Sequence, residues 1–346
     1  MTTVGEAMAR GRGDEPWQGL RGRRIDHLVR EDVPMSGAPI AAETLCGLGF
    51  DARLVTEREL ELVHDRILFV AGNPRAYKGT LARLAATDPA ARPTTIVWHT
   101  EPLPMPRAAG LRREPLTLRE LAKVVLRDRR INDHYSNARY LKALACARAV
   151  DVFAVATHAY QAYLAEQGVD VAFVPLGYHP AFGTLLERER DIDVLFLGDF
   201  RLRRRRRILR GLRRDGIDVL TLGDYADPSL WGEGRTELMN RTKIALNIPR
   251  LEGHLPDMRF VVAMATGALL VSEPVYLPDP YVAGRHYVEC PTADLAETIR
   301  LLLADTGSRR QITLEAHRFV TTELTLERSY ARLLSQAAAA ITRREP

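Results

Sequence analysis

The sequence predicts an α/β protein of two doubly wound, Rossmann-like domains, each with a parallel sheet covered by helices on both faces. Three observations support this prediction. Short apolar strands alternate with amphipathic helical segments, the alternation runs twice along the chain, and the 346 residues are about twice the roughly 150 of a typical domain. Strands separated by helical crossovers pair in parallel, which places helices on both faces of the sheet.

The two series of strands define the expected domains. Segments rich in Val, Ile and Leu predict the first series at 24–29, 52–56, 66–71, 94–98, 152–157 and 171–175. Helical patterns accompany them at 38–48, 75–86 and 138–149. The second series is expected at 192–198, 219–223, 244–248, 268–272 and 287–288. We therefore predict a flexible tail at 1–23, a first domain at 24–180, a second at 181–320, and a helix at 321–346 that crosses back to the first domain.

Composition excludes several classes of protein. With 46% hydrophobic and 27% charged residues the chain is typical of a globular protein, and no apolar run reaches the roughly 18 residues of a membrane span. The net charge of +5 is modest, almost all of the positive charge is arginine, and the strongly basic stretch is a single local one, so no nucleic-acid partner is expected. Cys46, Cys146 and Cys290 are far apart among apolar neighbours, which predicts reduced, buried thiols in a cytoplasmic protein.

Candidate site residues are those that follow strands. Ligands of parallel α/β sheets bind outside the carboxyl ends of the strands, so two such domains are expected to face a common cleft. In the first domain the candidates are Asp32, Ser36, His99 and Glu101. In the second domain they are Gly198, Arg203, Arg204, Asn247, His254, Asp257, Arg259 and Glu273.

At these positions the chain resembles a known family. The segments 150–157, 163–168, 173–180, 193–198, 240–247, 259–272, 284–288 and 294–303 resemble, in order and spacing, those of GT-B glycosyltransferases, especially the group-1 retaining and spore-maturation-type enzymes. The resemblance covers roughly 145–335 well and the front half in outline. It implies transfer of a sugar from a nucleoside-diphosphate sugar to an acceptor that the sequence does not identify. It implies no cofactor besides this donor substrate.

The resemblance also implies donor-pocket roles for His254, Asp257 and Arg259. Group-1 enzymes carry two glutamates eight positions apart around this helix, and the second binds the donor ribose. Here that second position is Val262, which cannot accept a hydrogen bond from a ribose hydroxyl. We expect Asp257 or Glu273 to replace it, or the ribose to be held differently. The stereochemical outcome stays open.

The arginine run at 201 and 203–207 has two interpretations. Cations in a first helical turn oppose the helix dipole, so most of these side chains would simply face water. Alternatively, a diphosphate at the loop that begins with Gly198 would be attracted by the helix N-terminus and by one or two arginines. We expect Arg203 and Arg204 to be these ligands and the others to be solvated.

His99 and Glu101 belong to the segment 98–104, which resembles the His-Glu-Pro loop of group-1 enzymes. This resemblance implies that His99 meets the donor sugar or the acceptor and that Glu101 orients it. The structural alternative is that His99 ends a strand and bonds a loop carbonyl. Asp32 and Ser36 are expected on the acceptor side, although a serine before a helix is also a common N-cap.

Metal-independent transfer is expected, because no Asp-x-Asp cluster follows a strand. A helix terminus and basic side chains would stabilise the leaving diphosphate instead. Three alternatives stay open: a nucleotide-sugar epimerase of the same fold, a non-catalytic nucleotide-sugar-binding relative, and a nucleic-acid binder suggested by the arginine run. The sequence does not indicate the base, the sugar, the acceptor or the oligomeric state.

Overall fold

The computed structural model describes residues 16–30, 37–111, 134–223 and 227–344, together with positions 118, 122 and 125. It divides into two compact units. The N-terminal unit contains Gly11–Val174 and Tyr330–Pro346, and the C-terminal unit contains Pro175–Ser329. The last helix of the chain therefore ends within the unit in which the chain begins its first strand.

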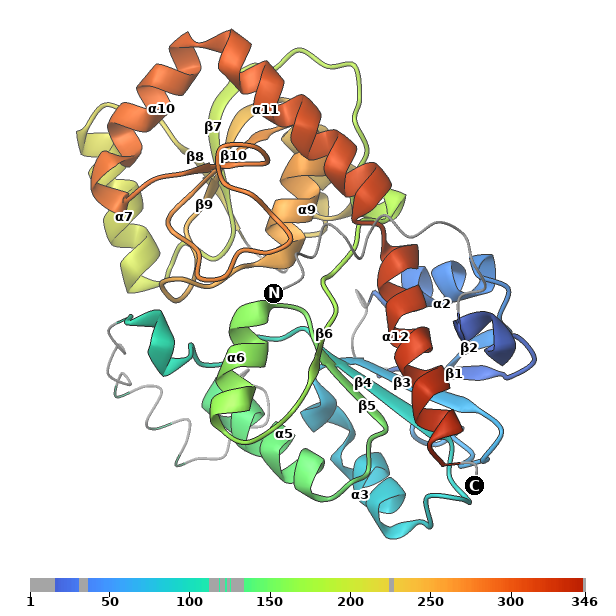
Figure 1. The fold of residues 1–346 in the computed structure, drawn as a ribbon. Coiled ribbons are helices and arrows are strands. Elements are labelled where there is room, and N and C mark those ends of the chain that lie inside the picture. Colours follow the sequence, from blue (N-terminus) through green and yellow to red (C-terminus); the bar gives the residue numbers. More distant parts are fainter. Residues whose placement is uncertain are drawn as a thin grey trace. The chain divides into compact units, whose positions relative to one another are not determined.

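The N-terminal unit is built on a six-stranded sheet in the order β2-β1-β3-β4-β5-β6, with every neighbouring pair parallel (Figure 1). Its strands are β1 (Ile25–Leu28), β2 (Ala52–Val55), β3 (Ile67–Gly72), β4 (Thr94–His99), β5 (Val152–Val155) and β6 (Ala172–Phe173). Its helices are α2 (Ala38–Gly47), α3 (Lys78–Ala86), α5 (His134–Cys146), α6 (His158–Glu166) and most of α12 (Leu326–Thr342), with 3-10 turns η1 (Pro16–Leu20), η2 (Pro74–Tyr77) and η3 (Arg107–Ala109).

Both faces of this sheet are buried, as its apolar strands require. On one face Leu68 and Val97 pack against Leu81 of α3. On the other face Phe69 packs against Tyr330 of α12, with ring centroids 5.2 Å apart, and Trp98 lies 5.8 Å from the same ring. Helix α12 is therefore part of the core of the N-terminal unit.

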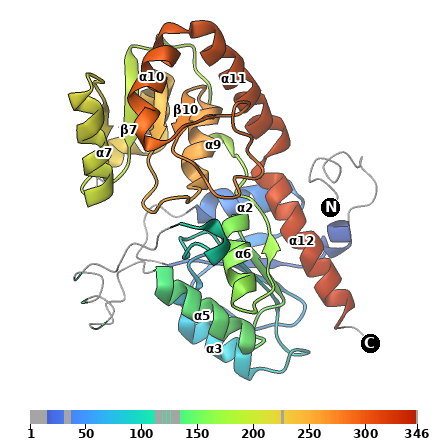
Figure 2. The same cartoon turned by 60° about the vertical axis from the view of Figure 1, so that its left-hand side comes forward.

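The C-terminal unit has a five-stranded parallel sheet in the order β11-β10-β9-β7-β8. Strands β7 and β10 of this sheet are labelled in Figure 2. Its strands are β7 (Ile192–Leu197), β8 (Leu220–Leu222), β9 (Thr242–Asn247), β10 (Leu269–Ser272) and β11 (Val288–Glu289). Its helices are α7 (Arg203–Arg214), α8 (Gly232–Asn240), α9 (Asp257–Ala265), α10 (Leu295–Ala304) and α11 (Thr306–Arg318), with short turns η4 (Pro180–Phe182), η5 (Pro228–Leu230), η6 (Thr292–Asp294) and η7 (Phe319–Glu323).

The strand order places a topological switch point between β7 and β9. The chain goes from β7 to β8 on one side and then returns to β9 on the other, so the connecting helices leave the sheet in opposite directions. Phe196 and Ile244 pack with Leu209 of α7 and Ile299 of α10 in one core. Ligands of doubly wound sheets bind at the carboxyl ends of the strands beside such a switch point.

The structure confirms the predicted fold class of two doubly wound parallel sheets. The predicted helix 75–86 is a 3-10 turn followed by α3. The prediction of buried thiols was wrong for Cys46 and Cys146, which are exposed, whereas Cys290 is buried. Helix α2 buries Leu45, and each further residue turns by about 100° around a helix, which carries Cys46 away from the core. In the described part of the chain no helix combines the length and apolarity that crossing a membrane would require.

Candidate functional site

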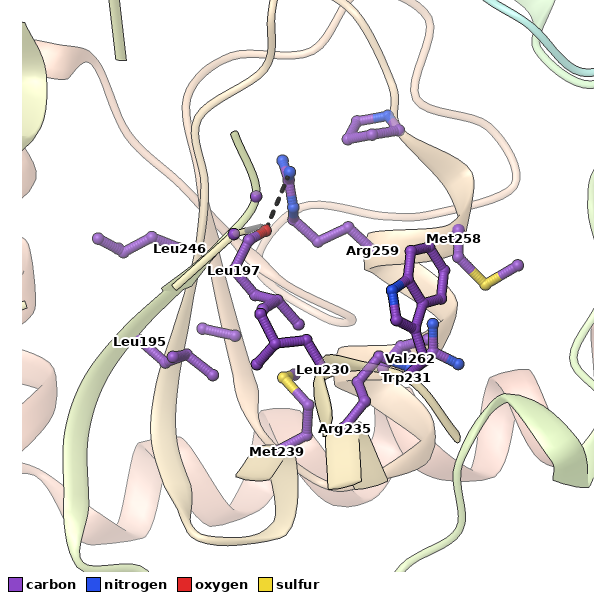
Figure 3. Close-up of a pocket in the computed structure, with 14 residues that line it drawn as sticks. Leu195, Leu197, Leu230, Trp231, Arg235, Met239, Leu246, Met258, Arg259 and Val262 are labelled. Atoms are coloured by element: carbon purple, nitrogen blue, oxygen red, sulfur yellow. Dashed lines mark hydrogen bonds between the residues drawn. The ribbon is translucent and has the colours of Figure 1, made fainter. Parts of the chain in front are cut away.

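A pocket of about 220 Å³ lies on the α8 and α9 side of the switch point in the C-terminal unit (Figure 3). Strands β7 and β9 form its base, and residues of α8 and α9 form its walls. Its described lining is mostly apolar and consists of Leu195, Leu197, Gly198, Gly223, Leu230, Trp231, Arg235, Met239, Ala245, Leu246, Pro256, Met258, Arg259 and Val262. Three sequence-predicted positions, Gly198, Arg259 and Val262, thus meet at one site.

Arg259 joins the two strands at the switch point. Its Nη1 donates to Asn247 Oδ1 at 2.6 Å, and its Nη2 donates to the Leu197 carbonyl at 3.3 Å, the bond drawn in Figure 3. Asn247 is buried and in turn donates from Nδ2 to Ser272 Oγ at 2.8 Å. The guanidinium is therefore held in place by the ends of β7, β9 and β10.

Two glycines let the backbone approach this guanidinium. Gly198 has a φ of +153°, and a Cβ there would lie 2.9 Å from Arg259 Nη2. At Gly223 a Cβ would lie only 2.0 Å from the carbonyl oxygen of Gly198. Side chains at either position would push the loop after β7 away from Arg259, so the close approach depends on glycine.

Arg204 and Glu273, both predicted donor ligands, bind each other. Arg204 Nη1 and Nη2 donate to the two carboxylate oxygens of Glu273 at 2.8 and 2.7 Å, and Thr292 Oγ1 also donates to Glu273. The carboxylate is 2% exposed and the arginine side chain 13%. Both oxygens of Glu273 are thus already engaged within the protein.

The arginine run divides by helix phase. Arg203, the first residue of α7, is exposed, whereas Arg205 is buried and donates to the carbonyls of Ile248 at 2.9 Å and Asp199 at 3.1 Å. The sequence contained a signal for this division. Arg204 and Arg205 precede the apolar Ile208 by four and three residues, which places them on the buried side of the helix.

His254 and Asp257 are buried but do not line the pocket. His254 is 6% exposed and Asp257, at the start of α9, is 8% exposed. Burial raises the pKa of Asp257 well above its usual range, and its Oδ1 makes no hydrogen bond to any described residue. The pocket wall is instead formed by the flanking Pro256 and Met258. A donor contact for His254 or Asp257 stays a prediction.

Trp231 and Arg235 were not identified from the sequence. The Arg235 guanidinium lies over the Trp231 ring, 5.8 Å from its centroid, and its Nη2 donates to the Phe182 carbonyl at 3.1 Å. Burial lowers the pKa of Arg235. Both residues follow β8 by nine or more positions, beyond the strand-end segments from which candidates were chosen. Their spacing of four on one helical face was the available signal.

In the N-terminal unit His99 is the last residue of β4 rather than the first residue after it. Its side chain is fully buried and its Nδ1 lies 3.1 Å from the Gly72 carbonyl. Burial lowers the pKa of His99 to about 4, so the ring is neutral near pH 7 and its Nδ1 donates to this carbonyl. The structural alternative expects such a bond to a carbonyl, although Gly72 is the last residue of β3 and not a loop residue, and the catalytic role stays a prediction. Glu101 is half-buried in the following loop, and Asp32 and Ser36 lie outside the described residues.

Comparison with known proteins bears on both units. Residues 203–335 match the family model described as glycosyl transferase-like. Curated protein sequences include no significant match. The fold is similar to HepE of Anabaena in complex with UDP-glucose, with a TM-score of 0.57 and 12% identity over 92% of this chain and 99% of that one.

The chain has the GT-B fold. Two further GT-B structures share its fold. One is WaaG, a glycosyltransferase involved in lipopolysaccharide biosynthesis, with a TM-score of 0.55 and 14% identity over 90% of this chain and 99% of that one. The other is TarM of S. aureus, with a TM-score of 0.57 and 10% identity over 81% of this chain, which spans 56% of the length of TarM. At these identities the likeness concerns the fold alone.

The GT-B family resemblance places a ribose-binding glutamate where this chain has Val262, and Val262 does line the pocket. The departure therefore lies at the candidate site itself. Within the described ranges, no three His, Cys, Asp or Glu side chains come together in an arrangement that could hold a metal ion. Metal-independent transfer stays a prediction.

Proposed function

We propose that this chain transfers a glycosyl unit from a nucleoside-diphosphate sugar to an acceptor, and that the donor nucleotide binds in the switch-point pocket of the C-terminal unit. The observation that carries the proposal is Arg259, which lies over the glycine-containing loop after β7 and is fixed by Asn247 and the Leu197 carbonyl. The guanidinium is held in place beside glycine residues, whose lack of side chains leaves room for a diphosphate to bind to it. HepE, which shares the fold, was crystallised with UDP-glucose and with UDP.

The size and lining of the pocket suggest which part of the donor binds in it. At about 220 Å³ it is smaller than the roughly 300–1,000 Å³ of pockets that enclose whole ligands, so it would take one part of the nucleotide. Its apolar walls and the Trp231 ring suit a base. The diphosphate would then lie towards Arg259 and the exposed Arg203 at the N-terminus of α7. Positive charge fixed there would stabilise the leaving diphosphate without a metal ion.

Residues of the N-terminal unit would bind the acceptor or the transferred sugar. We assign His99 to the sugar or acceptor and Glu101 to its orientation, as the family resemblance implies. A neutral His99 could accept a proton from an acceptor hydroxyl at Nε2, because Nδ1 already donates to Gly72. A cytoplasmic location, expected from the three free cysteines, is part of the same proposal.

One observation favours a second candidate. Val262 supplies an apolar side chain to the pocket at the position of the family's ribose glutamate, which is consistent with a relative that binds nucleotide sugars without transferring them. Donor hydrolysis or transfer measured with pools of acceptors separates the two candidates. Donor binding without either reaction would favour the non-catalytic one.

A thermal-shift panel tests the donor class. UDP, dTDP, GDP and ADP, each as diphosphate and as sugar conjugate, are added to the protein in the presence of a chelator. At least one should raise the melting temperature, because a ligand that binds only the folded state stabilises it. A shift that needs magnesium or manganese and disappears in chelator contradicts metal independence. No shift with any of them contradicts the donor assignment.

A further inference from the structure

Six arginines of α7 face away from the core of the C-terminal unit. They are all exposed and recur three, four, seven, ten and eleven positions after the first, which places them along one side of the helix. They are Arg203, Arg206, Arg207, Arg210, Arg213 and Arg214, here called the cationic face. The opposite side buries Ile208, Leu209 and Leu212, and α7 contains no acidic residue.

The cationic face is not neutralised by the part of the chain that the structure describes. None of its six arginines forms an ion pair with a described carboxylate, whereas four exposed arginines elsewhere each have such a partner: Arg53 with Asp51, Arg188 with Glu237, Arg241 with Asp191 and Arg285 with Glu315. Like charges three and four positions apart destabilise a helix. Those in its first turn also oppose the helix dipole. The local sequence therefore works against helix stability, and a bound polyanion would reverse that effect.

We propose that the cationic face of α7, apart from Arg203, which the proposed function assigns to the diphosphate, binds the surface of an anionic phospholipid membrane. Twelve residues of helix form a straight row about 18 Å long, and a bilayer presents its phosphates in one plane, so several arginines reach headgroups together. The guanidinium fork matches phosphate oxygens. Because the apolar side of α7 is already buried in the core, the helix rests on the headgroups, and binding depends on salt.

Exposed apolar side chains flank the cationic face. Phe200 is 38% exposed and precedes α7 by three residues. At the other end Arg300 of α10 donates to the carbonyl of Asp215, which follows α7, and the adjacent Leu301 is 64% exposed. Both side chains are exposed near an end of α7, where they are available for apolar contact with the membrane interface. A single-stranded nucleic acid is a poorer fit, since such ligands stack on aromatic rings in a basic groove and the cationic face contains no aromatic residue.

Vesicle sedimentation with the full chain tests the proposal. The protein should sediment with vesicles of phosphatidylcholine and phosphatidylglycerol at low salt, remain in solution with phosphatidylcholine alone, and be released at high salt. The combined variant Arg206→Gln, Arg207→Gln, Arg210→Gln and Arg213→Gln should lower the partition coefficient at least about a hundredfold, because each basic residue near an anionic surface contributes on the order of a fivefold effect. Its circular dichroism and its stabilisation by UDP should match the wild type.

A matched control variant removes the same number of arginine charges at other exposed positions. Arg53→Gln, Arg188→Gln, Arg241→Gln and Arg285→Gln together should leave sedimentation close to that of the wild type. Equal loss in both variants would mean that net charge, and not the cationic face, drives binding. Absence of sedimentation with phosphatidylglycerol, or equal sedimentation with phosphatidylcholine alone, also overturns the proposal. Competition with single-stranded RNA provides a further test. If RNA at an equal phosphate concentration releases the protein from vesicles, nucleic acid is the preferred partner and the proposal is overturned.

Discussion

Arg204 and Glu273 form a two-pronged salt bridge in which both guanidinium nitrogens meet both carboxylate oxygens, at 2.8 and 2.7 Å. Arg204 is in the first turn of α7, and Glu273 directly follows β10. The pair therefore ties the start of the arginine-rich helix to the carboxyl edge of the sheet. Two side chains that the sequence analysis assigned to the donor are already bound to each other.

Arg204→Met is expected to lower the free energy of unfolding by on the order of 3–5 kcal/mol, because it leaves the buried carboxylate of Glu273 without its partner. The double variant Arg204→Met, Glu273→Met should recover much of this loss. Arg203→Met, at the neighbouring exposed position, should stay within about 0.5 kcal/mol of the wild type. Urea unfolding measures all three. Equal stabilities of the Arg203 and Arg204 variants would show that the salt bridge contributes little.

Arg259→Met should weaken nucleoside-diphosphate binding by about tenfold to a hundredfold or more, since a hydrogen bond to a charged group contributes roughly 1.5–3 kcal/mol. Arg203→Ala should weaken it as well, whereas Arg206→Ala and Arg207→Ala should do much less. Titration calorimetry with the diphosphate identified by the thermal-shift panel measures the affinities. Equal losses at Arg203, Arg206 and Arg207 would indicate a diffuse positive field in place of a defined site.

Arg235 should select the base. The described side chains of the pocket that form strong hydrogen bonds, those of Trp231, Arg235 and Arg259, are all donors. Uracil and cytosine have the same shape, but uracil presents a carbonyl where cytosine presents an amino group. UDP should therefore bind about tenfold or more tightly than CDP, and Arg235→Met should narrow this ratio. Arg188→Met, at an exposed position, should leave the ratio unchanged. Equal affinities of the wild type for UDP and CDP would contradict this assignment.

His99→Ala tests the role of the histidine at the end of β4. If the imidazole meets the sugar or acceptor, turnover should fall by about two orders of magnitude or more while diphosphate affinity stays nearly constant. Steady-state kinetics and calorimetry on the same preparation separate the two effects, and thermal unfolding reports any damage to the fold. Wild-type turnover in a folded variant would leave His99 with only the structural bond to Gly72.

His27 should make stability depend on pH. It stacks on Phe69 with a centroid separation of 5.7 Å, its ring nitrogens bond to no described residue, and burial lowers the pKa of His27 from 6.5 to about 4. Between these values only the unfolded chain takes up the proton, so the free energy of unfolding is fully retained above about pH 6.5 and falls as the pH drops towards 4. The loss is about 2 kcal/mol at pH 5.

His27→Phe should remove this part of the pH dependence in urea unfolding at pH 7 and pH 5. The ring keeps its stacking partner and has no proton to bind. His64→Gln, at an exposed position, serves as the control and should leave the profile as it is. An unchanged profile in His27→Phe would show that other groups cause the acid sensitivity.

The sequence by itself determined the strands, their parallel pairing and the two sheets, because apolar periodicity and segment order are local properties that one chain displays directly. It also placed Gly198 and Arg259 at the pocket, since strand-end position and family resemblance agree there, and it placed Val262 there through the family resemblance alone. It did not identify Trp231 or Arg235, which reach the pocket through the packing of α8 on the sheet. Nor did it show that His99 is buried, because burial depends on the neighbouring strands.

Only the tertiary structure decided which arginines of the run bind within the protein and which face outward. The side chains of Arg203, Arg204 and Arg205 are chemically identical, and their surroundings differ because each residue turns by about 100° around α7. Arg204 and Arg205 point inward, and they donate to Glu273 and to the Ile248 carbonyl, which are both distant in sequence. The sequence determines which residues are charged, whereas the ion-pair and hydrogen-bond partners of each charge are determined only when the strands and helices pack together.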